Sequence, residues 1–140
     1  MARARPSSRS TPNGILDTRP TVRTGSCAGT CQTLASGATL VLHVAGQGGV
    51  PASGATAVAL NITAVNGGGP FGYLAVWPTD EPQPVTAELV YFPGQVIGNA
   101  ALAKVAADGT ISIAASSGPV DLVVAVTGYF VTPVPTVTYT

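Results

Sequence analysis

Charged side chains are scarce in this sequence. Of its 140 residues, 9% are charged: six are Lys or Arg and six are Asp or Glu. The chain has one histidine in addition. The surface of a small soluble domain normally carries about 25–35% charged residues. We therefore expect either a surface of Thr, Ser, Gly and Ala or cover by partner subunits.

The residues that enzymes and metal sites require are equally scarce. A serine or cysteine nucleophile needs a base beside it, and His43 alternates with the apolar Leu42 and Val44, which predicts a solvated strand residue. Two cysteines and one histidine are too few for a typical four-ligand zinc site. The Gly-rich turn at 66–70 separates two predicted strands, so it does not match a phosphate-binding loop. We expect no enzyme activity, no metal and no cofactor.

Long apolar runs are also missing. No stretch reaches 18 uninterrupted apolar residues, so we expect no membrane span. The basic N-terminus, as it stands, is not followed by the apolar run of a secretory signal.

What is present favours β-structure. Gly and Pro, 17 and 12 residues, interrupt helices, and Val, Ile and Thr make up more than a quarter of the chain. Apolar and polar residues alternate in several short runs, which predicts an all-β fold, an antiparallel β-sandwich of jelly-roll or Ig-like type. The predicted strands are 39–44, 57–63, 73–77, 86–92, 101–105, 110–114 and 121–126. Between two of these runs, Asp108-Gly109 predicts a hairpin.

The charges divide the chain into parts. Residues 1–23 hold five arginines against Asp17, a net charge of +4, and residues 24–140 hold Lys104 against five acids, a net charge of −4. We expect a flexible basic arm over 1–14, one sandwich domain over 15–131 and an extended Pro/Thr tail over 132–140. The candidate residues for docking on a partner are Arg3, Arg5, Arg9, Arg19 and Arg23.

The arm and the tail both suggest protein partners. Arginines also bind phosphates, but no aromatic residue for base stacking precedes Phe71. We therefore expect a protein assembly and not nucleic acid. The tail keeps β-forming residues around Pro133 and Pro135, so it is either an edge strand that pairs with a neighbouring subunit in a homo-oligomer or a frayed terminus.

Two small groups of residues leave alternatives open. Cys27 and Cys31 enclose a short loop that a disulfide could close, which would imply an oxidising final location; inert thiols or redox chemistry are the alternatives. Tyr73, Trp77 and Tyr91 could form an aromatic strip that contacts a host-surface glycan, or they could pack in the core.

Several motifs occur in an order that resembles a known module. They are Ile15–Arg19, Gly49–Pro51, Ala57–Asn66, Gly72–Pro78, Pro93–Gln95, Asn99 and Gly128–Phe130. Together they resemble a β-rich module that is repeated in actinobacterial exported and cell-wall-associated proteins and is found in actinobacteriophage structural proteins. Glu88–Phe92 and Ala125 depart from its pattern. The resemblance implies an accessory, non-enzymatic module without a defined ligand.

Two functions follow as hypotheses. In the first, the protein decorates a phage virion, a capsid accessory that docks on a larger assembly through its arm and tail. In the second, it is an extracellular or cell-wall carbohydrate-binding module that uses Tyr73, Trp77 or Tyr91.

Overall fold

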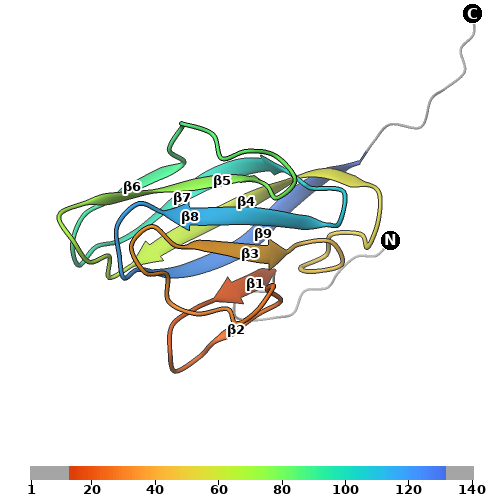
Figure 1. Cartoon of the computed structure of the whole chain (residues 1–140). Helices are drawn as coiled ribbons and strands as arrows, with labels where there is room; N and C mark the ends of the chain where they lie inside the picture. The colour runs from red at the N-terminus through yellow and green to blue at the C-terminus, as the bar shows by residue number, and fades with distance from the viewer. Residues whose placement is uncertain (1–12, 132–140) are drawn as a thin grey trace, which may run out of the picture.

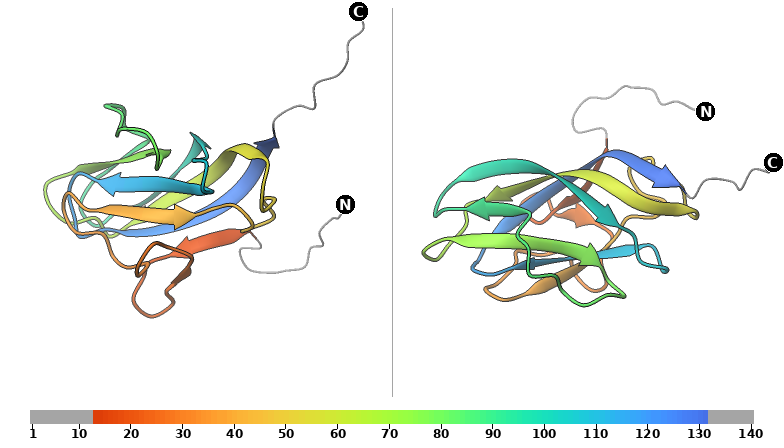
Figure 2. Two further views of the ribbon diagram at one scale, coloured as in Figure 1. Left: turned by 45° about the vertical axis from the view of Figure 1, so that its right-hand side comes forward. Right: turned by 90° about the horizontal axis from the view of Figure 1, so that it is seen from above.

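The structure, a computed structural model, describes residues 13–131, which form nine strands and no helix (Figure 1). One sheet has five strands in the order β2 (Thr24–Gly25), β1 (Gly14–Asp17), β9 (Asp121–Val131), β4 (Ala55–Val65) and β7 (Val96–Lys104). The other has four strands in the order β3 (Thr39–His43), β8 (Thr110–Ala115), β5 (Gly72–Pro78) and β6 (Leu89–Tyr91). All strand pairs are antiparallel, and the two sheets pack face to face (Figure 2), so the predicted antiparallel β-sandwich is confirmed.

The core follows the predicted alternation. In β9, the side chains of Leu122, Val124 and Val126 are buried, and they alternate with partly exposed residues. The inward residues of β3, β4, β5 and β8 are buried as well, and all of them belong to one apolar cluster. In β8 and most of β5 the outward residues are also buried. Because alternate side chains of a strand point to opposite faces, this single cluster fixes the register of every long strand.

The predicted hairpin at Asp108-Gly109 is wrong. The turn itself forms, because the Gly109 N–H donates to the Ala106 carbonyl and the Asp108 carboxylate accepts from the Thr110 hydroxyl. However, β7 pairs with β4, whereas β8 pairs with β3 and β5. The turn therefore carries the chain from one sheet to the other, a connection typical of Greek-key and jelly-roll sandwiches.

Strand boundaries differ from the predicted ones at several ends. The short strands β1 and β2 were not among the predicted strands. Strand β9 continues to Val131, and β7 already begins at Val96. In these two added segments, the start of β7 and the end of β9, the side chains are mostly exposed. The apolar alternation that marks a strand in the sequence is therefore weak there.

Candidate docking surface

The arginines proposed for partner docking divide into two groups. Arg3, Arg5 and Arg9 lie outside the described residues. Arg19 and Arg23 lie inside them, and both have partners within the chain. The guanidinium of Arg19 contacts the Asp17 carboxylate at 2.6 Å, and this hydrogen bond holds the pKa of Asp17 below its ordinary value. Arg19 therefore forms an exposed ion pair at the end of β1.

Arg23 belongs to a polar network that ties the N-terminal segment to β9. Its guanidinium donates to the Thr18 carbonyl at 2.9 Å and to the Thr33 hydroxyl at 3.1 Å. The hydroxyls of Thr18 and Thr33 each donate to the same oxygen of Asp121 at 2.7 Å. Thr18 is fully buried, and hydrogen bonds of buried groups to a carboxylate are among the strong ones in proteins. The network holds the exposed Arg23 side chain beside β9.

Cys27 and Cys31 form a disulfide, with their Cα atoms 5.5 Å apart. The Cys31 side chain is buried in the core, and Cys27 packs against it. Cys27 also bridges to Leu42 of β3. The disulfide therefore fixes the loop after β2 onto the edge of the four-stranded sheet.

The structure does not bring Tyr73, Trp77 and Tyr91 together on one surface. Tyr91 points into the core, is 1% exposed, and donates its hydroxyl to the Ser117 carbonyl. Trp77 lies on the outer face of the four-stranded sheet but is only 8% exposed, clustered with Ala75 and Ala114. Tyr73 alone is exposed, so a sugar strip of these three rings does not exist in this fold.

A different apolar patch surrounds Tyr73. Tyr73 pairs with Val90 across β5 and β6, and both point outward because their neighbours Leu74 and Tyr91 point inward. Phe71 and Phe92 lie beside this pair, with ring centroids 5.9 Å apart, within the range of favourable aromatic contacts. We call these four residues the aromatic patch; their exposed fractions are Phe71 53%, Tyr73 39%, Val90 43% and Phe92 52%.

The sequence carries a signal for this patch in the residues on either side of Gly72 and Tyr91. Phe71 and Tyr73 flank Gly72, and Val90 and Phe92 flank Tyr91. Once Tyr91 is placed in the core, alternation sends both flanking residues outward. The local sequence does not show which face of β6 packs against the core, so it does not show which of these residues are exposed.

The described residues show no cluster of metal-ligating side chains. Across residues 13–131, no three His, Cys, Asp or Glu side chains gather where they could hold a metal ion. His43 is exposed on the outer face of β3. Across the same range, no helix is long and apolar enough to cross a membrane.

Comparison with known proteins adds no relative. The sequence matches no model of a protein family and no curated protein.

Proposed function

We propose that this protein is a non-enzymatic structural protein of a virion surface that docks on a larger protein assembly. The observation that carries the proposal is the aromatic patch of Phe71, Tyr73, Val90 and Phe92, four adjacent side chains that are each about half exposed. Contiguous exposed apolar patches mark interaction sites in soluble proteins. Aromatic residues are enriched and charges depleted at the centre of protein interfaces, and the aromatic patch has both features, with three aromatic rings and no charged side chain among its four residues.

The resemblance to a module of actinobacteriophage structural proteins supports the virion as the place of action. The basic arm and the Pro/Thr tail provide further docking segments; residues 1–12 and 132–140 lie outside the described residues. Arg19 and Arg23 hydrogen-bond within the chain but stay exposed, so they remain candidate docking residues together with Arg3, Arg5 and Arg9.

The test is co-sedimentation with particles of the producing phage in a density gradient. We expect the wild-type protein in the particle band, and we expect the double variant Phe71→Ser/Phe92→Ser to be lost from it. Val85→Ser is the matched control, because Val85 is 100% exposed and lies outside the patch. Wild-type protein absent from the particles, or a patch variant that remains bound, would overturn the proposal.

A second variant tests the arm without disturbing the fold. The Asn13 carbonyl accepts a hydrogen bond from Val126, and β1 begins at Gly14. Removal of residues 1–12 therefore keeps this hydrogen bond and the whole of β1. We expect this truncation to release the protein from particles while its unfolding midpoint stays unchanged.

A cell-wall glycan is the second candidate partner, and the exposed ring of Tyr73 is the observation that favours it. Aromatic rings offer sugars an apolar face, and the tyrosine hydroxyl can form hydrogen bonds. The test is binding to insoluble peptidoglycan. Binding that is lost in Tyr73→Ala, together with the absence of the wild-type protein from particle fractions, would assign the protein to the cell wall instead.

A further inference from the structure

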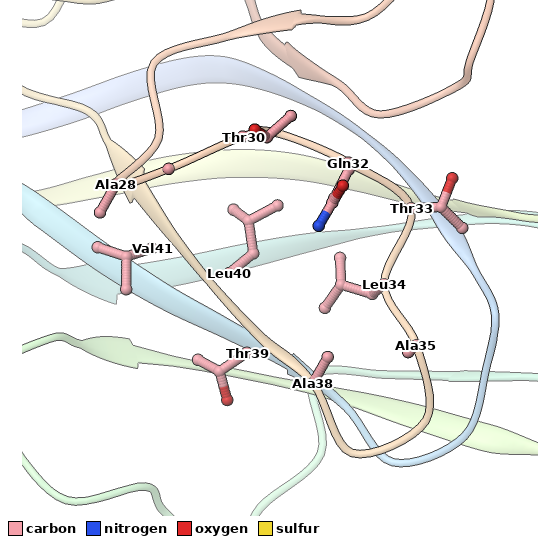
Figure 3. Close-up of a pocket in the computed structure, with 11 residues that line it drawn as sticks. Ala28, Thr30, Gln32, Thr33, Leu34, Ala35, Ala38, Thr39, Leu40 and Val41 are labelled. Carbon is pink, nitrogen blue, oxygen red and sulfur yellow. The ribbon is translucent and has the colours of Figure 1, made fainter.

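An open hollow lies between β3 and the loop that leads into it. It has a volume of about 360 Å³, which lies in the range of ligand sites in proteins. Figure 3 shows the loop and the strand enclosing it as a ring, with Leu34 and Leu40 inside the ring and the Gln32 amide directed over it. None of the residues that line the hollow is charged.

One wall of the hollow is the outer edge of β3. The Ala115 N–H donates to the Ala38 carbonyl, and the Val44 N–H donates to the Gly109 carbonyl. By the alternation of an antiparallel ladder, the even-numbered residues of β3 therefore direct their backbone groups toward β8. The odd-numbered residues direct theirs away from β8.

Only part of that outer edge is paired. The Val41 carbonyl accepts from Ala28, and the His43 N–H donates to Ser26. In the described part of the chain, no backbone group pairs with the N–H of Val41 or with the N–H and carbonyl of Thr39 on this side. Two donors and one acceptor of the sheet thus face the hollow.

The disulfide explains why the pairing stops there. The segment at 26–28 runs along β3, and then Gly29 adopts a φ of +93° and the Cys27–Cys31 bond turns the chain away. The loop then reaches the five-stranded sheet at Leu34, which bridges to Val120, the residue before β9. The fold thereby holds open the space that the next residues of a paired strand would fill.

We infer that this hollow receives residues 136–140 of a second copy of this chain as an added strand. This inference deepens the proposed function, because it names the subunit contact made by the tail. Addition of an extended segment to an exposed sheet edge is a recurring mode of peptide recognition. The backbone of the segment would supply partners for Thr39 and Val41.

The chemistry of the hollow selects this segment among those outside the described residues. Residues 136–140 read Thr-Val-Thr-Tyr-Thr, a run of β-branched and aromatic residues with neither proline nor charged side chains. An added strand with this alternation places Val137 and Tyr139 on one face, where Leu34 and Leu40 are the apolar neighbours. The N-terminal segment instead would bring Arg3, Arg5 or Arg9 into an uncharged site.

The segment has to come from another copy because its own hollow is out of reach. The hollow lies at the beginning of β9, since Leu34 bridges to Val120. Strand β9 then runs eleven residues from Asp121 to Val131, and the distance between its ends is roughly 33 Å at the rise of a β-strand. The five residues from Val131 to Thr136 span at most about 18 Å.

The experiment uses a chain that ends at Pro135 and a synthetic peptide of residues 132–140. We expect the full chain to associate with increasing concentration in analytical ultracentrifugation and the shortened chain to remain a monomer. The peptide should bind the shortened chain, and its addition should shift the NMR amide signals of Thr39 and Val41 most.

Two variants of one residue give the matched comparison. Thr39→Pro removes the free N–H at the first position of β3, where proline is tolerated, and should weaken peptide binding at least tenfold. Thr39→Val keeps the N–H and should bind within twofold of the parent. If Thr39→Pro does not fold, Gln32→Arg replaces it, because this exposed side chain fills the hollow with a charge and should weaken binding equally.

Three results would overturn the inference: no binding at millimolar peptide, equal binding by Thr39→Pro and Thr39→Val, or NMR shifts centred on β6 or β7. Particle attachment is measured separately with the aromatic-patch variants. If the protein attaches to particles but does not bind the peptide, only the tail contact is refuted. If the protein binds the peptide but attaches to no particle, only the virion proposal is refuted.

Discussion

The hydroxyl of Thr18 donates a hydrogen bond of 2.7 Å to the carboxylate of Asp121, although the two residues lie 103 positions apart in the chain. The same hydroxyl accepts the Leu122 N–H at 2.9 Å, and the Thr18 N–H donates to the Leu122 carbonyl. One buried threonine thus connects the segment after β1 to the first residues of β9. The N-terminal strand, which carries the basic arm, is held to the sandwich at this point.

Thr18→Val should therefore destabilise the domain by about 1–3 kcal/mol. The substitution keeps the shape of the side chain, but it leaves the buried Leu122 N–H without its acceptor and removes a donor from Asp121. Urea unfolding measures the change. Thr127→Val in the same strand is the control, because Thr127 is exposed and its replacement should change the free energy of unfolding by less than about 0.5 kcal/mol. Equal effects of the two substitutions would contradict this role of Thr18.

A close approach of Tyr91 explains the glycine at position 72. Gly72 is the cross-strand partner of Tyr91, and a Cβ atom at Gly72 would lie 2.5 Å from the Tyr91 hydroxyl oxygen. Gly72→Ala should therefore cost about 1–3 kcal/mol, as overpacking of a core does. Because Phe71 and Tyr73 flank this glycine, the same substitution should also lower particle attachment.

The matched glycine is Gly128. A Cβ atom there would meet Ala59 at 3.9 Å, an ordinary contact, so Gly128→Ala should leave the midpoint of thermal unfolding unchanged or raise it. A stability of Gly72→Ala equal to that of Gly128→Ala would mean that Tyr91 moves freely.

Loss of the disulfide should lower the stability of the domain without unfolding it. A loop as short as Cys27–Cys31 contributes about 2 kcal/mol in the chain-entropy model. The variant Cys27→Ser/Cys31→Ser should therefore remain folded, with a lower urea midpoint. Wild-type protein under reducing conditions should match the variant. An unchanged midpoint after complete reduction, verified by thiol titration, would refute this contribution.

Alternation predicted the parts of the fold in which one face is buried and the other is not. In β3 and β9 it identified the inward residues, such as Leu42 and Val124, and the outward His43. It could not identify the partner of each strand, because β7 and β8 follow each other in the chain and yet join different sheets. Pairing depends on contacts between segments far apart in the sequence, which local patterns do not record.

The aromatic residues show a second limit. Alternation places Tyr73 and Trp77 on the same face of β5, yet Tyr73 is exposed and Trp77 is buried. The difference arises because Trp77 packs with Ala75 and Ala114, small residues that leave room for the indole ring. A pattern of apolar positions along one strand does not encode the sizes of neighbours on the next strand.

Tyr91 should make the domain sensitive to alkali. Burial raises the pKa of its phenol above the ordinary value of about 10. The unfolded chain therefore releases this proton at a lower pH than the folded chain does. The stabilisation is complete below about pH 10 and is lost as the pH rises toward the folded-state pKa, with a slope of up to about 1.4 kcal/mol per pH unit.

Tyr91→Phe should remove that slope. At neutral pH it should cost about 1 kcal/mol, because the hydrogen bond to the Ser117 carbonyl is lost. Urea midpoints measured between pH 8 and about pH 11 should therefore converge for the wild type and the variant as the pH rises. Tyr73→Phe is the control, since Tyr73 lies on the surface and its replacement should keep the alkaline slope of the wild type. Parallel pH profiles for Tyr91→Phe and the wild type would show that another group causes the alkaline loss of stability.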